Sequence, residues 1–173
     1  MSQTYSAALP ITHVVLRVLV VVNWLYGAAI FALLFLAPTR PWIMSALDLR
    51  PGPEAERVIL GLRSIAAIGL ATIPINFLIL KRLLAIVEAV RAGQAFVAAN
   101  AVRLQTIAWA LLTLQVLSLI IGAIVRAISS PARPLDIDAG FSINGWLAVL
   151  LAFVLARVFT EGALMREDLE GTV

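Results

Sequence analysis

Four long apolar runs, separated by shorter polar segments, set the pattern of this chain. They cover residues 14–36, 58–80, 104–128 and 143–159. As helices rising about 1.5 Å per residue, runs of this length can cross the roughly 30 Å hydrocarbon core of a bilayer. The sequence therefore predicts an all-α fold, an integral membrane four-helix bundle, in which residues 1–173 form a single membrane domain.

The segment between the second and third runs, residues 81–103, keeps a helical spacing of apolar positions but is too polar to lie in hydrocarbon. Gly93 suits the end of a helix. A second helical run is predicted from Phe96, with Phe96, Asn100 and Leu104 four residues apart. We predict a helical hairpin that projects from the membrane; a pair of helices lying in the plane of the membrane surface is the alternative.

The composition supports a membrane location. Apolar residues make up 62% of the 173 positions, charged residues make up 13%, and the mean hydropathy is +1.01. Soluble domains carry about a quarter of their residues as charged side chains, so the solvent of this fold is expected to be mostly lipid. The net charge of +3 is spread along the chain without a basic run, which argues against direct binding of nucleic acid.

The chain offers few groups for catalysis or for holding a cofactor. It has no cysteine and one histidine, His13, so disulfides, thiolate metal sites and a bis-histidine haem within one chain are not expected. No span carries paired carboxylates, and no nucleophile–base pair or glycine-rich phosphate loop is visible. We therefore expect neither an enzyme nor a bound cofactor or metal ion. The absence of internal repeats and intramembrane acids also argues against a pump or a repeat-built transporter.

Five of the polar side chains within the predicted spans are candidates for one polar cluster, because an amide without a hydrogen-bond partner is costly there. The favoured interpretation is hydrogen bonding between helices, and the alternative is a small polar pocket that these side chains line. They are Asn23, Tyr26, Thr72, Asn76 and Gln115.

Small residues predict close helix packing at two places. Ser118 and Gly122 are four residues apart in the third span, and Ala148, Ala152 and Ala156 repeat every four residues in the fourth. Small side chains let helix backbones approach closely in a membrane. These faces can serve packing within the chain or against another membrane protein, and self-association stays open.

The orientation is only weakly marked by charge. Four spans place both termini on one side, and that side receives seven Lys and Arg residues against six on the other. The Lys81-Arg82 pair next to a span favours the termini and the hairpin on the cytoplasmic side. The polar tail, residues 160–173, is expected to begin as a continuation of the fourth helix.

Two motifs carry a family resemblance. One is the spacing of Gly93, Phe96, Asn100 and Leu104 before a span, and the other is the C-terminal stretch 159–173. Together with the four spans, they resemble the bacterial membrane family catalogued as domain of unknown function 2975. The resemblance implies a protein of the bacterial inner membrane with no settled activity. It also implies a partnership with a small, separately encoded helix-turn-helix regulator.

The first functional hypothesis is thus a non-enzymatic regulatory membrane protein that engages a cytoplasmic partner through the hairpin and tail. The alternative is an accessory or structural subunit of a larger membrane complex, and a further alternative is a binder of small molecules within the bundle. The residues expected to contact the cytoplasmic partner are Phe96, Asn100, Leu104, Gly162 and Glu167.

Overall fold

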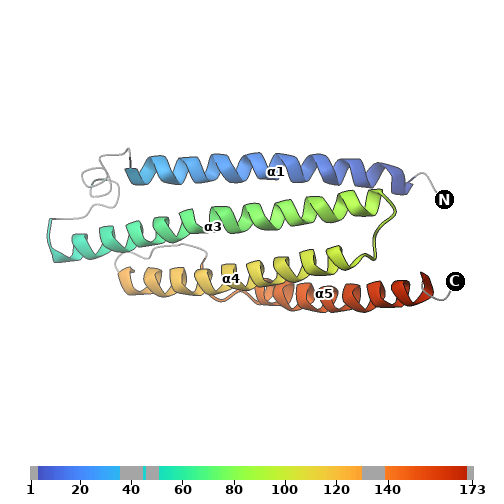
Figure 1. The fold of residues 1–173 in the computed structure, drawn as a ribbon. Helices are drawn as coiled ribbons and strands as arrows, with labels where there is room; N and C mark the ends of the chain where they lie inside the picture. The colour runs from blue at the N-terminus through green and yellow to red at the C-terminus, as the bar shows by residue number, and fades with distance from the viewer. Residues whose placement is uncertain (1–3, 36–44, 46–50, 130–138, 171–173) are drawn as a thin grey trace. The chain divides into compact units, whose positions relative to one another are not determined.

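The computed structural model describes residues 4–35, 45, 51–129 and 139–170, with side chains described except at residues 4–11, 33, 35, 167, 169 and 170. Within this part the chain forms four long helices and no strand (Figure 1). All four are long and apolar enough to cross a membrane, so the predicted all-α membrane bundle is confirmed. The helices are α1 (Thr4–Phe35), α3 (Pro53–Arg91), α4 (Ala98–Ile128) and α5 (Ile143–Glu170).

The helices extend beyond the predicted spans, both at the hairpin and at the start of α1 and the end of α5. α3 begins with proline and two acidic residues in its first turn, which suits the start of a helix. It continues through Pro74 to Arg91 without a break. The first arm of the hairpin is therefore a continuation of the second span and not a separate helix in the membrane plane. α4 ends and α5 begins where the sequence predicts, at residues 128 and 143, and α5 continues through most of the predicted polar tail.

Gly93 ends α3, as predicted. Its φ is +74°, a left-handed conformation that glycine adopts without the steric cost of a Cβ. Its N–H donates to the Val90 carbonyl at 3.0 Å, and the Gln94 N–H donates to the Ala89 carbonyl at 2.9 Å. The prediction for Phe96 is wrong, because α4 starts at Ala98 and Phe96 lies in the connecting loop, residues 92–97.

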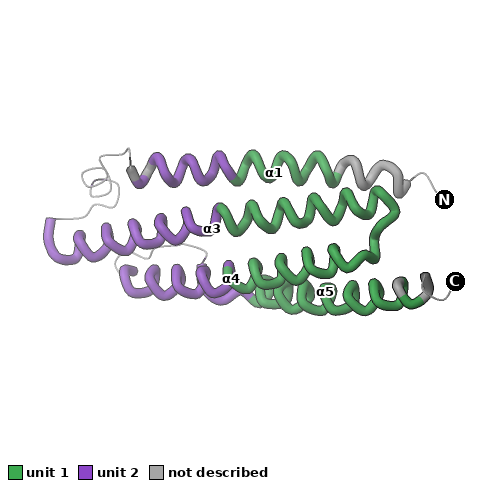
Figure 2. Tube along the Cα trace, in the orientation of Figure 1, with its two compact units in different colours: residues 1–23, 74–113, 143–173 green, residues 24–73, 114–142 purple. Residues whose placement is uncertain are grey.

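Contacts divide the chain into two compact units (Figure 2). Unit 1 comprises residues 1–23, 74–113 and 143–173, and unit 2 comprises residues 24–73 and 114–142. Unit 1 thus contains parts of all four helices. Unit 2 contains parts of α1, α3 and α4, together with the segment that precedes α5.

In unit 1, α5 packs through a stripe of small side chains. Val149, Ala152, Ala156 and Ala163 are buried, whereas Ala148 is exposed. A strict four-residue spacing rotates about 40° per step around a helix with 3.6 residues per turn. The buried positions are three, four and seven residues apart, which keeps them on one face of the helix. Ala148 lies outside this face, although the sequence groups it with Ala152 and Ala156.

In unit 2, α3 packs on both α1 and α4. Ala55 and Val58 form a buried cluster with Leu62 and with Ile128 of α4. On the other side, Ile73 is buried and lies against the surface of Gly27 in α1. In the most apolar window of each helix no more than 22% of the residues are buried. Few residues of these windows are thus fully buried, as expected where the surrounding solvent is lipid.

Candidate functional site

The loop of the hairpin is held from inside by Asn100. This side chain, in the first turn of α4, has none of its surface exposed. Its Nδ2 donates to the carbonyl oxygens of Ala95 at 2.8 Å and Gln94 at 3.1 Å, and its Oδ1 accepts a bond of 2.7 Å from Nη1 of Arg103. The amide thereby satisfies two loop carbonyls that would otherwise need hydrogen bonds from water.

Arg103 connects the same network to α3. Its Nη1 also donates to the Ala85 carbonyl at 3.1 Å, so α3, α4 and the loop share one set of hydrogen bonds. The structure therefore corrects the role predicted for Asn100. A fully buried side chain cannot touch a partner in this conformation, and Asn100 instead fixes the shape of the loop.

Phe96 joins the loop to α5. Its ring centroid lies 5.1 Å from that of Phe159. A Cβ added to Gly162 would lie 3.0 Å from Cδ1 of Phe96, so the absence of a side chain at Gly162 lets the ring rest on α5. Phe96 nevertheless keeps 48% of its surface exposed. The two motifs that carry the family resemblance therefore lie in contact through Phe96 and α5.

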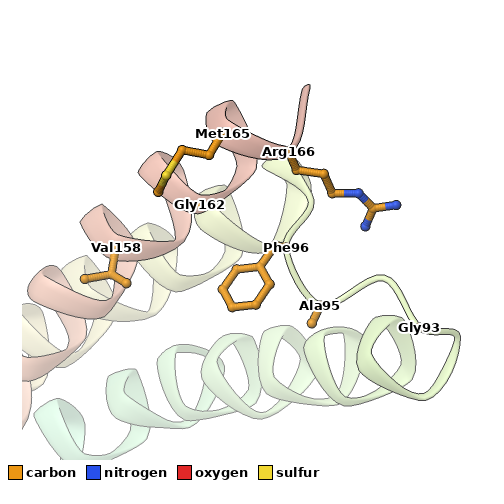
Figure 3. A pocket seen from close by; sticks show the side chains of 7 residues that line it. All are labelled: Gly93, Ala95, Phe96, Val158, Gly162, Met165 and Arg166. Carbon is orange, nitrogen blue, oxygen red and sulfur yellow. The ribbon is translucent and has the colours of Figure 1, made fainter. Parts of the chain in front are cut away.

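Beside this contact lies a groove of about 440 Å³ (Figure 3). The Phe96 ring points into the space between the loop and α5, whereas the charged end of Arg166 points away from the ring. We call this surface the hairpin groove. Its lining residues are Gly93, Ala95, Phe96, Val158, Gly162, Met165 and Arg166.

Sequence reasoning missed four of these residues: Ala95 in the loop and three on α5. Val158, Met165 and Arg166 lie four residues before, three after and four after Gly162, which is the spacing of one helix face. That spacing could have identified them once Gly162 was chosen. Of the other predicted residues, Leu104 is half-buried on α4, and the Glu167 side chain lies outside the described residues.

The five polar residues chosen from the spans divide between the two units. Tyr26 and Thr72 line a pocket of about 370 Å³ in unit 2. Gln115 also belongs to unit 2, and its buried Oε1 finds no hydrogen-bond partner among the described residues. Asn23 and Asn76 belong to unit 1.

Ser118 and Gly122 meet a loop instead of a helix. The Gly140 N–H donates to the Ser118 hydroxyl at 3.2 Å, and that hydroxyl donates to the Gly140 carbonyl, also at 3.2 Å. A Cβ added to Gly122 would lie only 2.7 Å from the Gly140 Cα. The small pair predicted for helix packing therefore receives the backbone of the segment before α5.

No group of three or more His, Cys, Asp or Glu side chains that could hold a metal ion occurs in the described part of the chain. In unit 1, His13 Nε2 of α1 lies 3.4 Å from Glu88 Oε1 of α3. These residues offer a surface and a pocket, and no arrangement of a nucleophile and a base.

A family model described as "Protein of unknown function (DUF2975)" matches residues 48–173. The matched region includes the hairpin loop, the groove and both sequence motifs, and it confirms the resemblance that those motifs carry. No curated protein matches the chain. No solved structure matches it either.

Proposed function

This chain belongs to the DUF2975 family of proteins of unknown function, and we propose that it is a non-enzymatic regulatory membrane protein that binds a soluble protein at the hairpin groove. The observation that carries the proposal is an aromatic side chain, Phe96, held half-exposed on a base of buried hydrogen bonds. Aromatic anchors in apolar pockets supply much of the binding energy in protein–protein interfaces.

The position of the groove favours a partner from water over one from lipid. About 20 helical residues cross the hydrocarbon, so a helix that begins at Ile143 has crossed it near Gly162. Leu164 and Met165 follow, with 56% and 63% of their surfaces exposed. Apolar side chains gathered beyond the hydrocarbon indicate an interaction surface, and a flexible thioether adapts well to a partner.

The buried network beneath the groove favours binding by limiting the entropy that association must overcome. Asn100 and Arg103 fix the loop before any partner arrives. A surface that is already ordered loses less freedom when it binds. Phe96 is thus presented in a fixed position between the loop and α5.

We further propose that the groove faces the cytoplasm of a bacterial cell, with the chain in the inner membrane. The partner suggested by the family resemblance is a small helix-turn-helix regulator. Binding would hold such a regulator at the membrane and away from its DNA sites. The membrane protein itself needs no DNA-binding surface for this action.

One observation favours a second candidate, an accessory subunit of a membrane complex. Ala148 is exposed on α5 beside exposed leucines such as Leu147 and Leu151. A small residue on an outward face allows another helix to approach closely. In this second candidate the partner lies in the membrane and contacts α5 instead of the hairpin groove.

The test is affinity purification of the tagged full-length protein from native membranes, with quantitative mass spectrometry of the proteins that co-purify. The variants are Phe96→Ala and, as a matched control, Leu150→Ala, which removes an exposed apolar side chain from α5 outside the groove. We expect one soluble protein to fall at least tenfold with Phe96→Ala and to remain with Leu150→Ala. A thermal unfolding curve for each variant shows that the fold is kept.

If no soluble protein depends on Phe96 in a folded variant, the regulatory proposal fails. Membrane subunits that co-purify in fixed ratio and are lost with Ala148→Leu would establish the second candidate in its place.

A further inference from the structure

We propose that the pocket of unit 2 binds a small alcohol dissolved in the bilayer, a molecule with one hydroxyl group and a hydrocarbon body of about a dozen atoms. The pocket measures about 370 Å³ and lies among α1, α3, α4 and the segment before α5. Ligand sites in proteins range from about 300 to 1,000 Å³. At roughly 30 Å³ per water-sized group, this volume holds about twelve such groups.

The lining of this pocket is apolar apart from three hydroxyl groups. Leucine and isoleucine side chains form most of the wall, and the small residues Ala66 and Gly69 leave the space open. The hydroxyls belong to Tyr26, Thr72 and Ser118. Mostly apolar walls with a few polar groups are the usual form of a small-molecule site.

The bonds already made by these hydroxyls select the ligand. Thr72 Oγ1 donates its only proton to the Gly69 carbonyl at 2.7 Å, and the Ser118 hydroxyl donates to the Gly140 carbonyl. Toward a ligand, both can only accept a hydrogen bond. The Tyr26 phenol can donate as well as accept. A ligand hydroxyl, which also donates and accepts, can use both kinds of partner, whereas a hydrocarbon uses neither.

The depth of these hydroxyls selects a free molecule over a phospholipid. Tyr26 and Thr72 lie ten and eight residues from the nearer ends of the predicted spans 14–36 and 58–80, which is about 12 Å or more along a helix. The ester oxygens of a phospholipid stay at the edge of the hydrocarbon core. The oxygen that meets Tyr26 and Thr72 must therefore belong to a molecule that lies within the core.

The backbone before α5 is a second, independent sign of a site. Ser118, which holds Gly140, lies ten residues before the end of α4 at Ile128, about 15 Å along the helix. Residues 139–142 thus lie beside α4 as non-helical backbone, and Ala139 lines the pocket. At membrane depth such backbone occurs only where it is buried in protein or lines a cavity.

The test uses the purified full-length protein in nanodiscs of phosphatidylethanolamine and phosphatidylglycerol. The probe is a dodecanol that carries a photoreactive diazirine, and unlabelled dodecanol is the competitor. A parallel arm uses a phospholipid with the diazirine in its acyl chain. Peptide mass spectrometry locates the labelled residues, and no soluble partner is present, so the result is separate from the proposed function.

We expect saturable labelling by the alcohol on helix segments that line the pocket, and little competition at other sites. Gly69→Leu fills the pocket and should lower this labelling at least tenfold. Its Cβ has room, because the nearest atom would be Ile30 Cδ1 at 3.6 Å. Tyr26→Phe removes one oxygen atom and should weaken binding about three- to tenfold, the range of one hydrogen bond. The control Leu150→Ala, at an exposed position of unit 1, should change nothing.

Labelling that never saturates, or that resists both pocket variants, would overturn the proposal. Saturable labelling of the pocket by the phospholipid alone would also overturn it. If Gly69→Leu does not fold, Tyr26→Phe decides the outcome, since it leaves the shape of the pocket unchanged.

Discussion

Helix α4 holds a non-helical segment in each unit, and it does so by opposite means. In unit 1 the large amide of Asn100 reaches back to the carbonyls of the hairpin loop. In unit 2 the small residues Ser118 and Gly122 leave room for the backbone of Gly140 itself. The first arrangement supports the loop from beneath and leaves Phe96 facing outward. The second draws the chain inward beside a pocket. The difference indicates that unit 1 presents a surface, whereas unit 2 encloses a volume.

The largest effect is expected from Asn100→Leu. The variant replaces the amide by an apolar side chain of similar size; it leaves two loop carbonyls without a partner and removes one of the two hydrogen bonds of Arg103. Each unsatisfied buried group costs about 1–3 kcal/mol, so the free energy of unfolding should fall by about 3 kcal/mol. Thermal unfolding in detergent measures the change.

The control for this variant is Gln105→Leu, at an exposed amide on the same helix. It should leave the midpoint of unfolding nearly unchanged. Equal midpoints for the two variants would contradict the role assigned to Asn100.

A matched pair of glycine variants sharpens the comparison between the regions. In Gly122→Ala the new Cβ meets the backbone of Gly140 at 2.7 Å, whereas in Gly162→Ala it meets the Phe96 ring at 3.0 Å. Backbone cannot move aside without disturbing the whole segment, but a half-exposed ring can turn. We expect Gly122→Ala to lower the free energy of unfolding by about 2 kcal/mol, and Gly162→Ala to cost less than half of that. Gly52→Ala, with no atom within 4 Å of its new Cβ, is the control. A larger loss of unfolding free energy for Gly162→Ala than for Gly122→Ala would contradict this expectation.

A smaller effect is expected from Ser118→Ala. The variant removes the hydroxyl that bonds both the N–H and the carbonyl of Gly140. Neutral hydrogen bonds contribute about 0.5–1.5 kcal/mol each, so a loss of about 1–2 kcal/mol is expected. Hydrogen exchange at the Gly140 amide, followed by mass spectrometry, should become faster, while exchange in the hairpin loop stays as it was. Unchanged exchange at Gly140 would show that another group holds this segment.

The smallest effect is expected from an ion pair that joins neither region. Arg157 Nε donates to Glu161 Oε1 at 2.8 Å within α5, and both side chains are mostly exposed. Pairs of this kind stabilise helices by about 0.3–0.5 kcal/mol. Arg157→Gln should therefore shift the unfolding midpoint barely beyond error and leave partner capture intact. A loss comparable to that of Ser118→Ala would mean that Arg157 has a further contact.

The existence of the four spans could be predicted because long apolar runs are separated by polar segments. The residues at which α4 ends and α5 begins follow from this pattern. The partners of the hydrogen bonds by which α4 holds the two non-helical segments could not be predicted from spacing. Asn100 bonds carbonyls five and six positions earlier, and Ser118 bonds a residue 22 positions later. Neither separation has the period of a helix, so neither leaves a pattern in the sequence.

Because spacing does not reveal such contacts, Phe96 and Asn100 have positions in the structure that differ from those predicted. Phe96, Asn100 and Leu104 share a four-residue spacing, yet Phe96 lies before α4 and Asn100 is buried within the hairpin. Spacing alone does not reveal that a helix starts two residues after Phe96. Phe96 and Gly162 are each identified as residues of a motif, but their contact across 66 positions is seen only in the structure.

The most direct test of the central claim is photo-crosslinking in native membranes from two positions of α5. A photoreactive amino acid replaces Met165 in the hairpin groove or Leu150 outside it. We expect a discrete adduct with one soluble protein from position 165, and only lipid adducts from position 150. Lipid adducts alone at both positions, or the same protein adduct at both, would contradict a partner-binding groove at the hairpin.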